Sequence, residues 1–382
     1  MMFVEKQSIT VRLFVLLSVL VWCVNSGLQC LDNSGSPVDW WFIYKVNNGY
    51  TYAYFENEAE VGLKVQTNGQ TLQSGQNSAL ERTLNQIYKN KTTVNYIIYN
   101  DEKLDGSTPS GYGHTKGVLA FDARQNFQSV TLFRVHFEKK KKGGGKDTTN
   151  NQSKKKKKAY QFASSTTYAQ SFLCLTFTNY SEMNVSAYQL RYEKPYVLNY
   201  NIVDNESKWD NWNQVTGKKW LSGKSIQQMS TWKRFPLVHF ARSGDISTDI
   251  MEAIISPYYH CSFAWETWIR SPAEDSYCPP TYSYMELNVN LVTFADGTSF
   301  KETQDHSKIG ISFSCTSQLI VCVGSLNRMT SQDARGGGYA CFYHANLWNT
   351  LNSSFFNISY CPANSTTTTT TIPTYADAHC NS

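Results

Sequence analysis

Apolar residues in this chain fall into short segments divided by turn residues, which is typical of a mixed α/β protein. Helical spacing of apolar residues predicts helices at 78–88 and 249–256. Segments rich in β-branched and aromatic residues predict strands at 40–46, 94–99, 117–121, 129–137, 171–177, 236–241 and 285–294. Strands and helices alternate in both halves of the chain, so we expect an α/β (α+β) fold.

The 382 residues are enough for two ordinary domains or for one large domain built from two similar halves. Hydrophobic residues make up 41% and charged residues 17% of the chain, with 24 Tyr, 20 Phe and 10 Trp. This composition supplies ample apolar material for a packed core and excludes a globally disordered protein.

The N-terminus has the layout of a secretory signal peptide. Basic residues precede an apolar run at 13–24, and the small residues Ser26 and Gly27 follow it. The run has about 12 residues, fewer than the roughly 20 that a helix needs to cross a bilayer. We therefore expect residues 1–27 to be a signal peptide and the mature protein to be lysosomal or secreted, without a membrane anchor. A buried N-terminal helix is the alternative.

The cysteines agree with an oxidising compartment. Of the 10 Cys, Cys23 lies in the predicted signal peptide, and no C-x-x-C pair supports a structural zinc site. Dispersed cysteines in a secreted chain indicate disulfides, and the odd remainder leaves one thiol, for which Cys380 is the candidate. N-linked glycans are indicated by sequons that begin at Asn90, Asn151, Asn179, Asn184, Asn205, Asn352, Asn357 and Asn364.

Basic character is confined to one tract. Residues 139–158 contain ten Lys and one Asp and carry +9, whereas the whole chain carries +5, so the remainder carries −4. Because like charges repel and nothing apolar is available to bury, 138–158 is predicted to be a disordered insertion. It is interpreted as a solvated insertion or as a tether for a nucleic-acid backbone, and the signal peptide disfavours a nuclear localisation signal. The Thr-rich residues 362–382 predict a flexible tail.

The candidate chemistry lies in a short motif, H-x-K, that occurs twice. His114 and Lys116 precede one strand-like segment, and His306 and Lys308 precede the apolar run 309–313. On a strand, residues i and i+2 project from the same face, so each motif presents an imidazole beside an ammonium. An imidazole can act as nucleophile or proton donor, and a Lys can hold a phosphoryl oxygen. The two motifs by themselves leave a purely structural role equally open.

Further segments, ordered along most of the mature chain, complete a specific set. They are Cys30-Leu-Asp-Asn-Ser-Gly-Ser-Pro-Val-Asp-Trp-Trp-Phe-Ile-Tyr-Lys45, Gly111-Tyr-Gly-His-Thr-Lys-Gly117, Tyr168-Ala-Gln-Ser-Phe-Leu-Cys174, Pro236-Leu-Val-His-Phe-Ala-Arg-Ser243, Asp305-His-Ser-Lys308, Asn327-Arg328 and Arg335-Gly-Gly-Gly338. This set resembles the deoxyribonuclease II family. The chain departs from it at Ile309, where the family has Trp, and Asp122 falls one residue late for the superfamily pattern H-x-K-x4-D. Neither departure removes a catalytic His or Lys.

The resemblance implies a phospholipase D-like fold of two pseudo-symmetric halves, at 28–200 and 201–361, that share one active site. It implies that His114, Lys116, His306 and Lys308 are catalytic and that no metal or other cofactor takes part. Gly324-Ser-Leu-Asn327 is similar to the G-S-x-N element of that superfamily. Substrate-binding residues are implied at Gln170, Asn327, Arg328 and Arg335. Disulfides are implied for Cys30–Cys174, Cys322–Cys341 and Cys278–Cys361, which leaves Cys261–Cys315 as the fourth pair.

The activity implied is that of an acid endodeoxyribonuclease that cleaves double-stranded DNA to 3′-phosphate and 5′-hydroxyl ends. One histidine attacks phosphorus to form a phosphohistidine, and the other protonates the leaving oxygen and then activates water. By analogy His114 is the nucleophile and His306 the general acid, although the residues alone do not separate these roles. The alternatives are a catalytically weak secreted relative that binds DNA or host partners, and a phospholipid-acting diesterase of the same superfamily.

The Lys tract generates a first prediction. A flexible polycation cannot read bases, but it displaces counterions from any duplex. Deleting 139–158 should therefore raise KM for DNA at low salt and flatten its salt dependence. The value of kcat should barely change, because uniform binding does not accelerate chemistry. Steady-state kinetics across a salt series measure this, and an unchanged KM and salt slope would return the tract to a solvated insertion.

Overall fold

The computed structural model describes residues 27–57, 62–66, 69–103, 105–122, 128–133, 160, 162, 166–203, 210–270, 272–315 and 319–361. The predicted signal peptide (apart from Gly27), the Lys tract and the Thr-rich tail lie outside the described residues. None of the described helices is long and apolar enough to cross a membrane.

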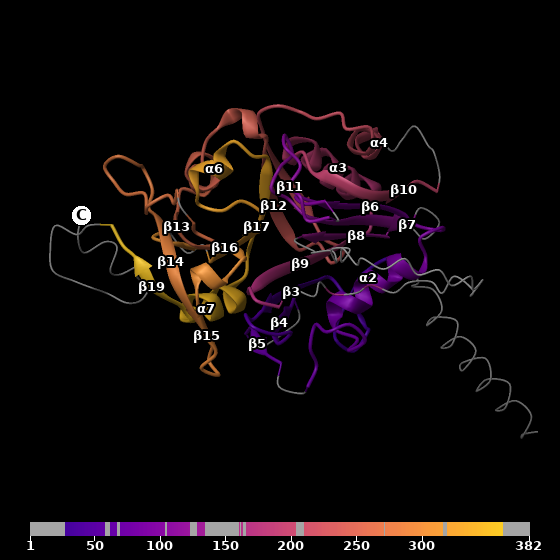
Figure 1. Ribbon diagram of the computed structural model, residues 1–382, viewed down its shortest axis with the longest axis horizontal. Helices are drawn as coiled ribbons and strands as arrows, with labels where there is room; N and C mark the ends of the chain where they lie inside the picture. The colour runs from indigo at the N-terminus through magenta and orange to yellow at the C-terminus, as the bar shows by residue number, and fades with distance from the viewer. Residues whose placement is uncertain are drawn as a thin grey trace, which may run out of the picture.

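Two large sheets make up the fold, one from each part of the chain (Figure 1). The first sheet is antiparallel throughout. Its strands, in spatial order, are β10 (Tyr196–Asn201), β6 (Asn95–Asn100), β7 (Gly117–Asp122), β8 (Gln128–Phe133), β9 (Gln170–Phe177), β3 (Trp40–Lys45), β4 (Tyr52–Glu56) and β5 (Lys64–Val65). A separate small pair joins β1 (Cys30–Leu31) to β2 (Pro37–Val38).

The second sheet repeats this plan with one parallel pair, β13 with β14. Its strands, in spatial order, are β11 (Lys224–Ser230), β12 (Pro236–Arg242), β18 (Gly337–Tyr343), β17 (Ile320–Gly324), β16 (Lys308–Phe313), β13 (Ser262–Thr267), β14 (Glu286–Thr293) and β15 (Ser299–Lys301), with β19 (Phe355–Ser359) on β14. The mixed α/β (α+β) fold is confirmed, and the two sheets are compatible with two pseudo-symmetric halves.

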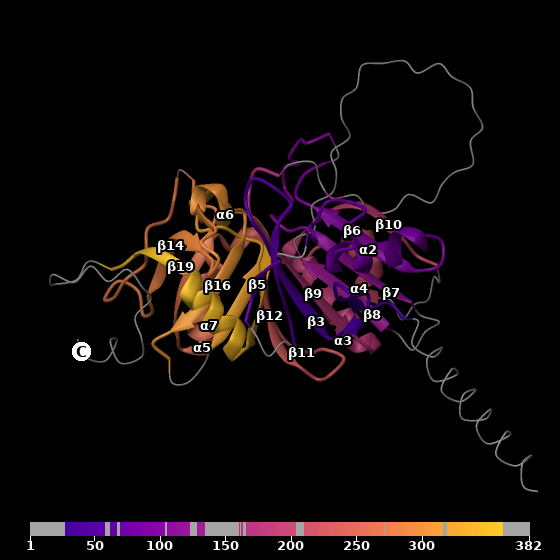
Figure 2. The same cartoon turned by 90° about the horizontal axis from the view of Figure 1, so that it is seen from below.

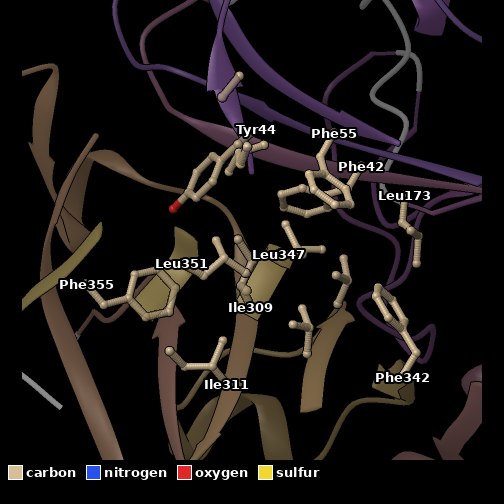
Figure 3. Close-up of a cluster of buried hydrophobic side chains, with 14 of the residues drawn as sticks. Phe42, Tyr44, Phe55, Leu173, Ile309, Ile311, Phe342, Leu347, Leu351 and Phe355 are labelled. Carbon is tan, nitrogen blue, oxygen red and sulfur yellow. The ribbon is translucent and has the colours of Figure 1, made fainter. Parts of the chain in front are cut away.

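The two sheets pack on each other through one shared core (Figure 2). Alternate residues of β3 divide between faces: Trp40, Phe42 and Tyr44 join the shared core, whereas Trp41 and Ile43 face the other way. Ile309 and Ile311 of β16 meet them from the second sheet (Figure 3). Because β3 is buried on both faces, its sequence is a continuous apolar run rather than an alternating one.

Helices cover the remaining faces of the sheets. The described helices are α2 (Ala79–Lys89), α3 (Tyr180–Glu193), α4 (Asp210–Thr216), α5 (Ser256–Tyr259), α6 (Thr330–Asp333) and α7 (Ala345–Ser354), with a π-helical turn at Met251–Ile255. Helix α2 packs on the first sheet's outer face. Helix α3 packs on β7 as well as on β11 and β12, so it lies between the two sheets.

All seven predicted strand segments contain strands, and the helix predicted at 78–88 is α2. Ser78 caps α2 by accepting a hydrogen bond from the Glu81 amide. The helix predicted at 249–256 is only the π-helical turn leading into α5. Helix α3 was not predicted, because it buries the polar residues Gln189 and Glu193 and shows no apolar stripe.

The part of the chain that the structure describes contains four disulfides, and they are the four expected pairs. Cys30–Cys174 joins β1 to β9 within the first half, across a sequence separation of 144. The others, all in the second half, are Cys261–Cys315, Cys278–Cys361 and Cys322–Cys341.

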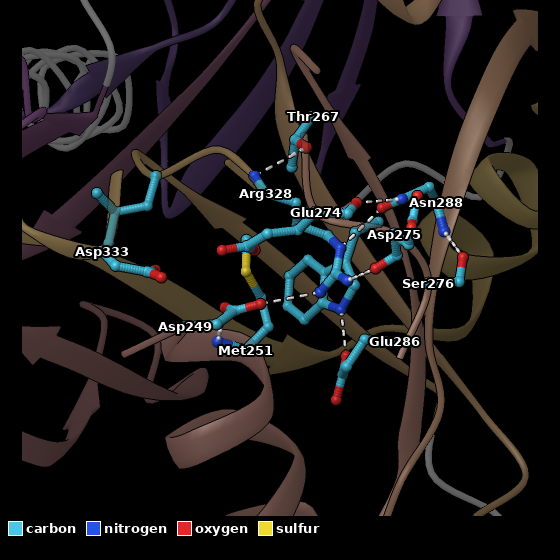
Figure 4. Close-up of polar contacts among 12 residues, drawn as sticks. Asp249, Met251, Thr267, Glu274, Asp275, Ser276, Glu286, Asn288, Arg328 and Asp333 are labelled. Atoms are coloured by element: carbon cyan, nitrogen blue, oxygen red, sulfur yellow. Dashed lines mark hydrogen bonds and ion pairs between the residues drawn. The ribbon is translucent and has the colours of Figure 1, made fainter. Parts of the chain in front are cut away.

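A buried arginine organises the polar centre of the second half (Figure 4). Arg328 is 0% exposed, and its guanidinium donates to Asp249 at 2.9 Å, Asn288 at 2.7 Å and the Asp275 carbonyl at 2.7 Å. Two further carboxyls lie near this centre. Burial raises the pKa of Glu286 to about 8, and burial with Asp249 raises the pKa of Glu274 to about 8. The folded protein therefore holds protons that an unfolded chain would release.

Removing a disulfide should lower the free energy of unfolding by more when that disulfide closes a longer loop. Replacing Cys30 and Cys174 by Ala should lower the free energy of unfolding by about 5 kcal/mol on the chain-entropy model. Replacing Cys322 and Cys341, whose separation is 19, should cost about 3 kcal/mol. Both pairs are fully buried, so packing losses are matched. Denaturant unfolding of the two double variants measures the difference, and equal losses would contradict the loop-length argument.

The buried carboxyls predict that stability falls as pH rises. A folded-state pKa of about 8 for Glu286 exceeds the ordinary value of about 4.3, so its contribution is complete below that ordinary value and is lost as pH rises through 8. Glu286→Gln keeps the shape without the titration and should flatten the loss of melting temperature between these limits. Asp296→Asn, an exposed carboxylate, is the control. A Glu286→Gln variant with the wild-type pH slope would refute the assignment.

Candidate active site

The two H-x-K motifs lie where strands of the two sheets begin. Lys116 directly precedes β7, and Lys308 is the first residue of β16. These two ends meet, because each histidine is hydrogen-bonded by the other half of the chain. The structure therefore brings the two motifs to the junction of the halves, and Lys308 lies near enough to act on the pKa of His114.

The His114 ring is held by the second half. Its Nδ1 lies 2.6 Å from the Ser325 carbonyl oxygen, and its backbone N–H donates to the Gly336 carbonyl at 2.8 Å. Because a carbonyl only accepts, Nδ1 carries a proton and Nε2 is the atom left for chemistry. Burial, followed by the charge of Lys116, lowers the pKa of His114 to about 3, against the opposing effect of Asp101. The ring is thus neutral at mildly acid pH.

Asp101 lies between the two functional groups of the first motif. This residue directly follows β6, and its carboxylate is 3.1 Å from His114 Nε2 and 2.9 Å from Lys116 Nζ. Burial raises the pKa of Asp101, but the charges of Lys116 and His114 outweigh burial and hold that pKa well below its usual range. Sequence reasoning missed Asp101. An acidic residue at the end of a strand next to the motif strand is the signal that could have found it.

The His306 ring is held by the first half and by aromatic faces. Its backbone N–H donates to the Ala169 carbonyl at 2.9 Å. The ring stacks on Tyr168 with centroids 4.1 Å apart, and Trp268 lies 4.2 Å away at an angle of 49°. The electron-rich faces of such rings attract a cation. Tyr168 and Trp268 are two further site residues that the motif pattern did not single out.

The Lys308 side chain turns back onto its own motif, and its charge also acts on the first motif. Its Nζ donates to the His306 carbonyl at 2.7 Å, and the side chain is almost fully buried. The charge of Lys308 contributes to the lowered pKa of His114, so the two motifs act on one another electrostatically. Glu266 lies beside it, and burial together with Asp305 raises the pKa of Glu266 well above its usual range.

The C-terminus of α3 supports the first motif from behind. The Glu193 carboxylate accepts from Thr115 Oγ1 at 2.6 Å and lies 3.2 Å from His239 Nε2. Its backbone leaves no room for larger neighbours, since a Cβ on Gly113 or Gly336 would lie 1.9 or 2.4 Å from the Glu193 carbonyl oxygen. The glycines on both sides of His114 are therefore required by close packing.

Three of the four predicted substrate-binding residues lie beside the motifs. Gln170 follows Ala169, the residue that anchors His306. Asn327 belongs to the same short element as Ser325, and its Oδ1 has no hydrogen-bond partner among the described residues. The Arg335 guanidinium donates to the Gly113 carbonyl at 3.0 Å.

Arg328 is the exception. Its guanidinium is fully buried and its donors go to Asp249, Asn288 and Asp275, so it lies away from the surface that a substrate could reach. Because Arg328 follows Asn327, it fixes the element that contains Ser325 and acts as a positioning residue.

A cavity of about 760 Å³ opens beside the first motif. Its wall includes Tyr112 and Arg335, whose neighbours Gly113 and Gly336 flank His114 in space, and it also includes Lys194 and Trp220. Aromatic and cationic side chains along one groove are typical of surfaces that bind nucleic-acid strands.

Comparison with known proteins identifies the family. A model of the deoxyribonuclease II family matches residues 29–361. The chain is 27% identical to Deoxyribonuclease-2 of Caenorhabditis elegans over 88% of this chain and 95% of the relative. It is 27% identical to Plancitoxin-1 of Acanthaster planci, over 88% and 92% respectively. It is 26% identical to Deoxyribonuclease-2-alpha of Sus scrofa, over 87% and 91%. The chain therefore belongs to the deoxyribonuclease II family and is a nuclease, a hydrolase that acts on phosphodiester bonds.

Proposed function

We propose that this protein is an acid endodeoxyribonuclease that hydrolyses double-stranded DNA without a metal ion, through a phosphohistidine, to 3′-phosphate and 5′-hydroxyl ends. The observation that carries the proposal is that each motif histidine is hydrogen-bonded to the other half of the chain. Ser325 of the second half binds His114, and Ala169 of the first half binds His306. Two imidazoles and two ammonium groups at one junction are what a two-step phosphoryl transfer needs.

The first step uses His114 as nucleophile. Its lowered pKa keeps the ring neutral at acid pH, and the proton on Nδ1 leaves the Nε2 lone pair free to attack phosphorus. The P–N bond forms as the P–O5′ bond breaks. The positive charge that develops on the ring is stabilised by the Ser325 carbonyl, which accepts from Nδ1.

His306 acts as general acid and then as general base. As an imidazolium it gives its proton to the departing 5′ oxygen, and as a neutral ring it takes a proton from the water that cleaves the phosphohistidine. The ring faces of Tyr168 and Trp268 suit the cationic form. Because the reaction begins with a protonated His306, activity should fall as pH rises toward neutrality.

Lys116 and Lys308 supply the positive charge that many nucleases take from a divalent cation. Both ammonium groups are buried beside the histidines, where a low dielectric strengthens their attraction for phosphoryl oxygens. Gln170, Asn327 and Arg335 are the proposed contacts to the DNA strand, and the cavity that Arg335 lines supports this role for Arg335. An acid enzyme of this kind, with disulfides and N-linked glycans, suits a lysosome or an acid extracellular space.

The proposal predicts a sharp division among substitutions. His114→Ala and His306→Ala should abolish plasmid cleavage near pH 5, because the first removes the nucleophile and the second removes the general acid and base. Lys116→Ala and Lys308→Ala should lower kcat by about two orders of magnitude, the scale of one lost oxyanion donor. EDTA should leave the wild-type rate unchanged, and end-labelling should detect 3′-phosphate.

Matched controls come from the second half of the chain. His260→Asn replaces an exposed histidine whose φ of 54° an Asn tolerates, and Lys301→Ala removes an exposed lysine. Both should cleave at the wild-type rate. Inhibition by EDTA would overturn the metal-free mechanism, and full activity in His306→Ala would overturn the two-histidine mechanism.

A further inference from the structure

The position of Asp101 has no explanation in the two-histidine mechanism. Its carboxylate spans His114 Nε2 at 3.1 Å and Lys116 Nζ at 2.9 Å, and its side chain is 10% exposed. These are the nucleophilic atom and the cation that the mechanism assigns to the scissile phosphate. A phosphate cannot approach Nε2 to reacting distance while the carboxylate lies there, since near-attack contacts are about 3–3.5 Å.

A carboxylate is a fair substitute for a phosphodiester at this place. Each carries one negative charge and offers two oxygens, and each accepts charge-assisted hydrogen bonds. In the free enzyme, Lys116 is only 6% exposed, and a buried ammonium without a counter-ion is costly. Asp101 removes that cost in the absence of DNA.

We propose that Asp101 is an internal substitute for the substrate phosphate, which occupies the phosphate position in the free enzyme and leaves it when DNA binds. This inference rests on the proposed function for the identity of the ligand, a phosphodiester. It also assigns the position of the scissile phosphate, between His114 Nε2 and Lys116 Nζ.

The contacts of Asp101 with His114 and Lys116 can be broken when a phosphate competes for them. The His114 ring donates from Nδ1 to Ser325, so its Nε2 can hold the carboxylate only while the ring is protonated, and a neutral ring gives up that hold. The hold on Asp101 then comes chiefly from Lys116, for which a phosphate competes. Asp101 begins the loop that leads to the motif, and Arg335 lies near enough for Asp101 to act on its pKa. Arg335 therefore offers a second cation to the displaced carboxylate.

Occupation of the site by Asp101 must weaken the binding of every competing anion. If the carboxylate is in place about nine-tenths of the time, the apparent affinity for phosphate is reduced about tenfold. Asp101→Asn should bind inorganic phosphate about tenfold more tightly than wild type near pH 5, measured by calorimetry on the full chain. Phosphate is singly charged there, as a phosphodiester is, and this measurement needs no nuclease activity.

The control is Glu102→Gln, which removes a negative charge from the next residue along the same loop. It should leave phosphate affinity within about twofold of wild type, because the carboxylate that lies on His114 Nε2 and Lys116 Nζ is that of Asp101. Equal tightening in both variants would mean a general charge effect and would overturn the proposal. An unchanged affinity in Asp101→Asn would make Asp101 a structural ion-pair partner and would also overturn it.

Two further outcomes stay informative. If Asp101→Asn is unstable because Lys116 loses the ion pair with Asp101, millimolar phosphate should restore its melting temperature and shift it by more than it shifts the wild type. Failure of that rescue would sink the proposal. If wild type proves inactive on DNA yet Asp101→Asn binds phosphate tightly, the proposed nuclease mechanism fails while the internal substitute stands.

Discussion

The site depends on an exchange of backbone contacts between the two halves. The second half holds His114 through the carbonyls of Ser325 and Gly336, and the first half holds His306 through the carbonyl of Ala169. Neither histidine is therefore oriented by its own half alone. The shared core of Phe42, Ile309 and their neighbours is what keeps these contacts in register, so packing far from the chemistry sets the geometry of the reacting atoms. This gives the continuous apolar character of β3 a functional reason, beyond stability.

The residues that face the motif histidine differ in chemical character between the two halves. In the first sheet Gly117, which follows the motif, pairs with Tyr99, and in the second sheet the corresponding Ile309 pairs with Glu266. Two residues further along these neighbouring strands stand Asp101 and Trp268. A carboxylate thus faces His114, and an indole faces His306. The same H-x-K motif is placed in an anionic setting once and in an aromatic setting once, which is a physical basis for two histidines with different roles.

The features that could be predicted from the sequence are those that depend on short segments of the chain. Apolar runs identified the strands, and an ordered family pattern identified His114, His306 and the cysteine pairs. The rest arises from tertiary contact. Helix α3 buries Gln189 and Glu193 because it lies between two sheets, so it lacks the stripe that marks a surface helix. Arg328 sits next to Asn327 in sequence, but its guanidinium points into a carboxylate cluster, and no pattern of neighbours could tell a substrate contact from a buried ion pair. Asp101 is one acidic residue among 30 Asp and Glu until the fold puts it on the motif.

Burial shifts the pKa values of carboxyls and of imidazoles in opposite directions, and at acid pH both shifts leave the buried groups neutral. Burial raises the pKa of Glu286 and Glu274 to about 8, so at acid pH these carboxyls are neutral and their desolvation costs little. Burial lowers the pKa of His114 to about 3, so at the same pH its ring is also neutral, as the proposed nucleophile must be. Carboxyls and imidazoles respond to burial in opposite directions because one gains charge on losing a proton and the other loses it. The proposed role of His114 as nucleophile needs a pH above about 3, and the stabilising contribution of Glu286 is lost as pH rises through 8, so a mildly acid compartment suits both.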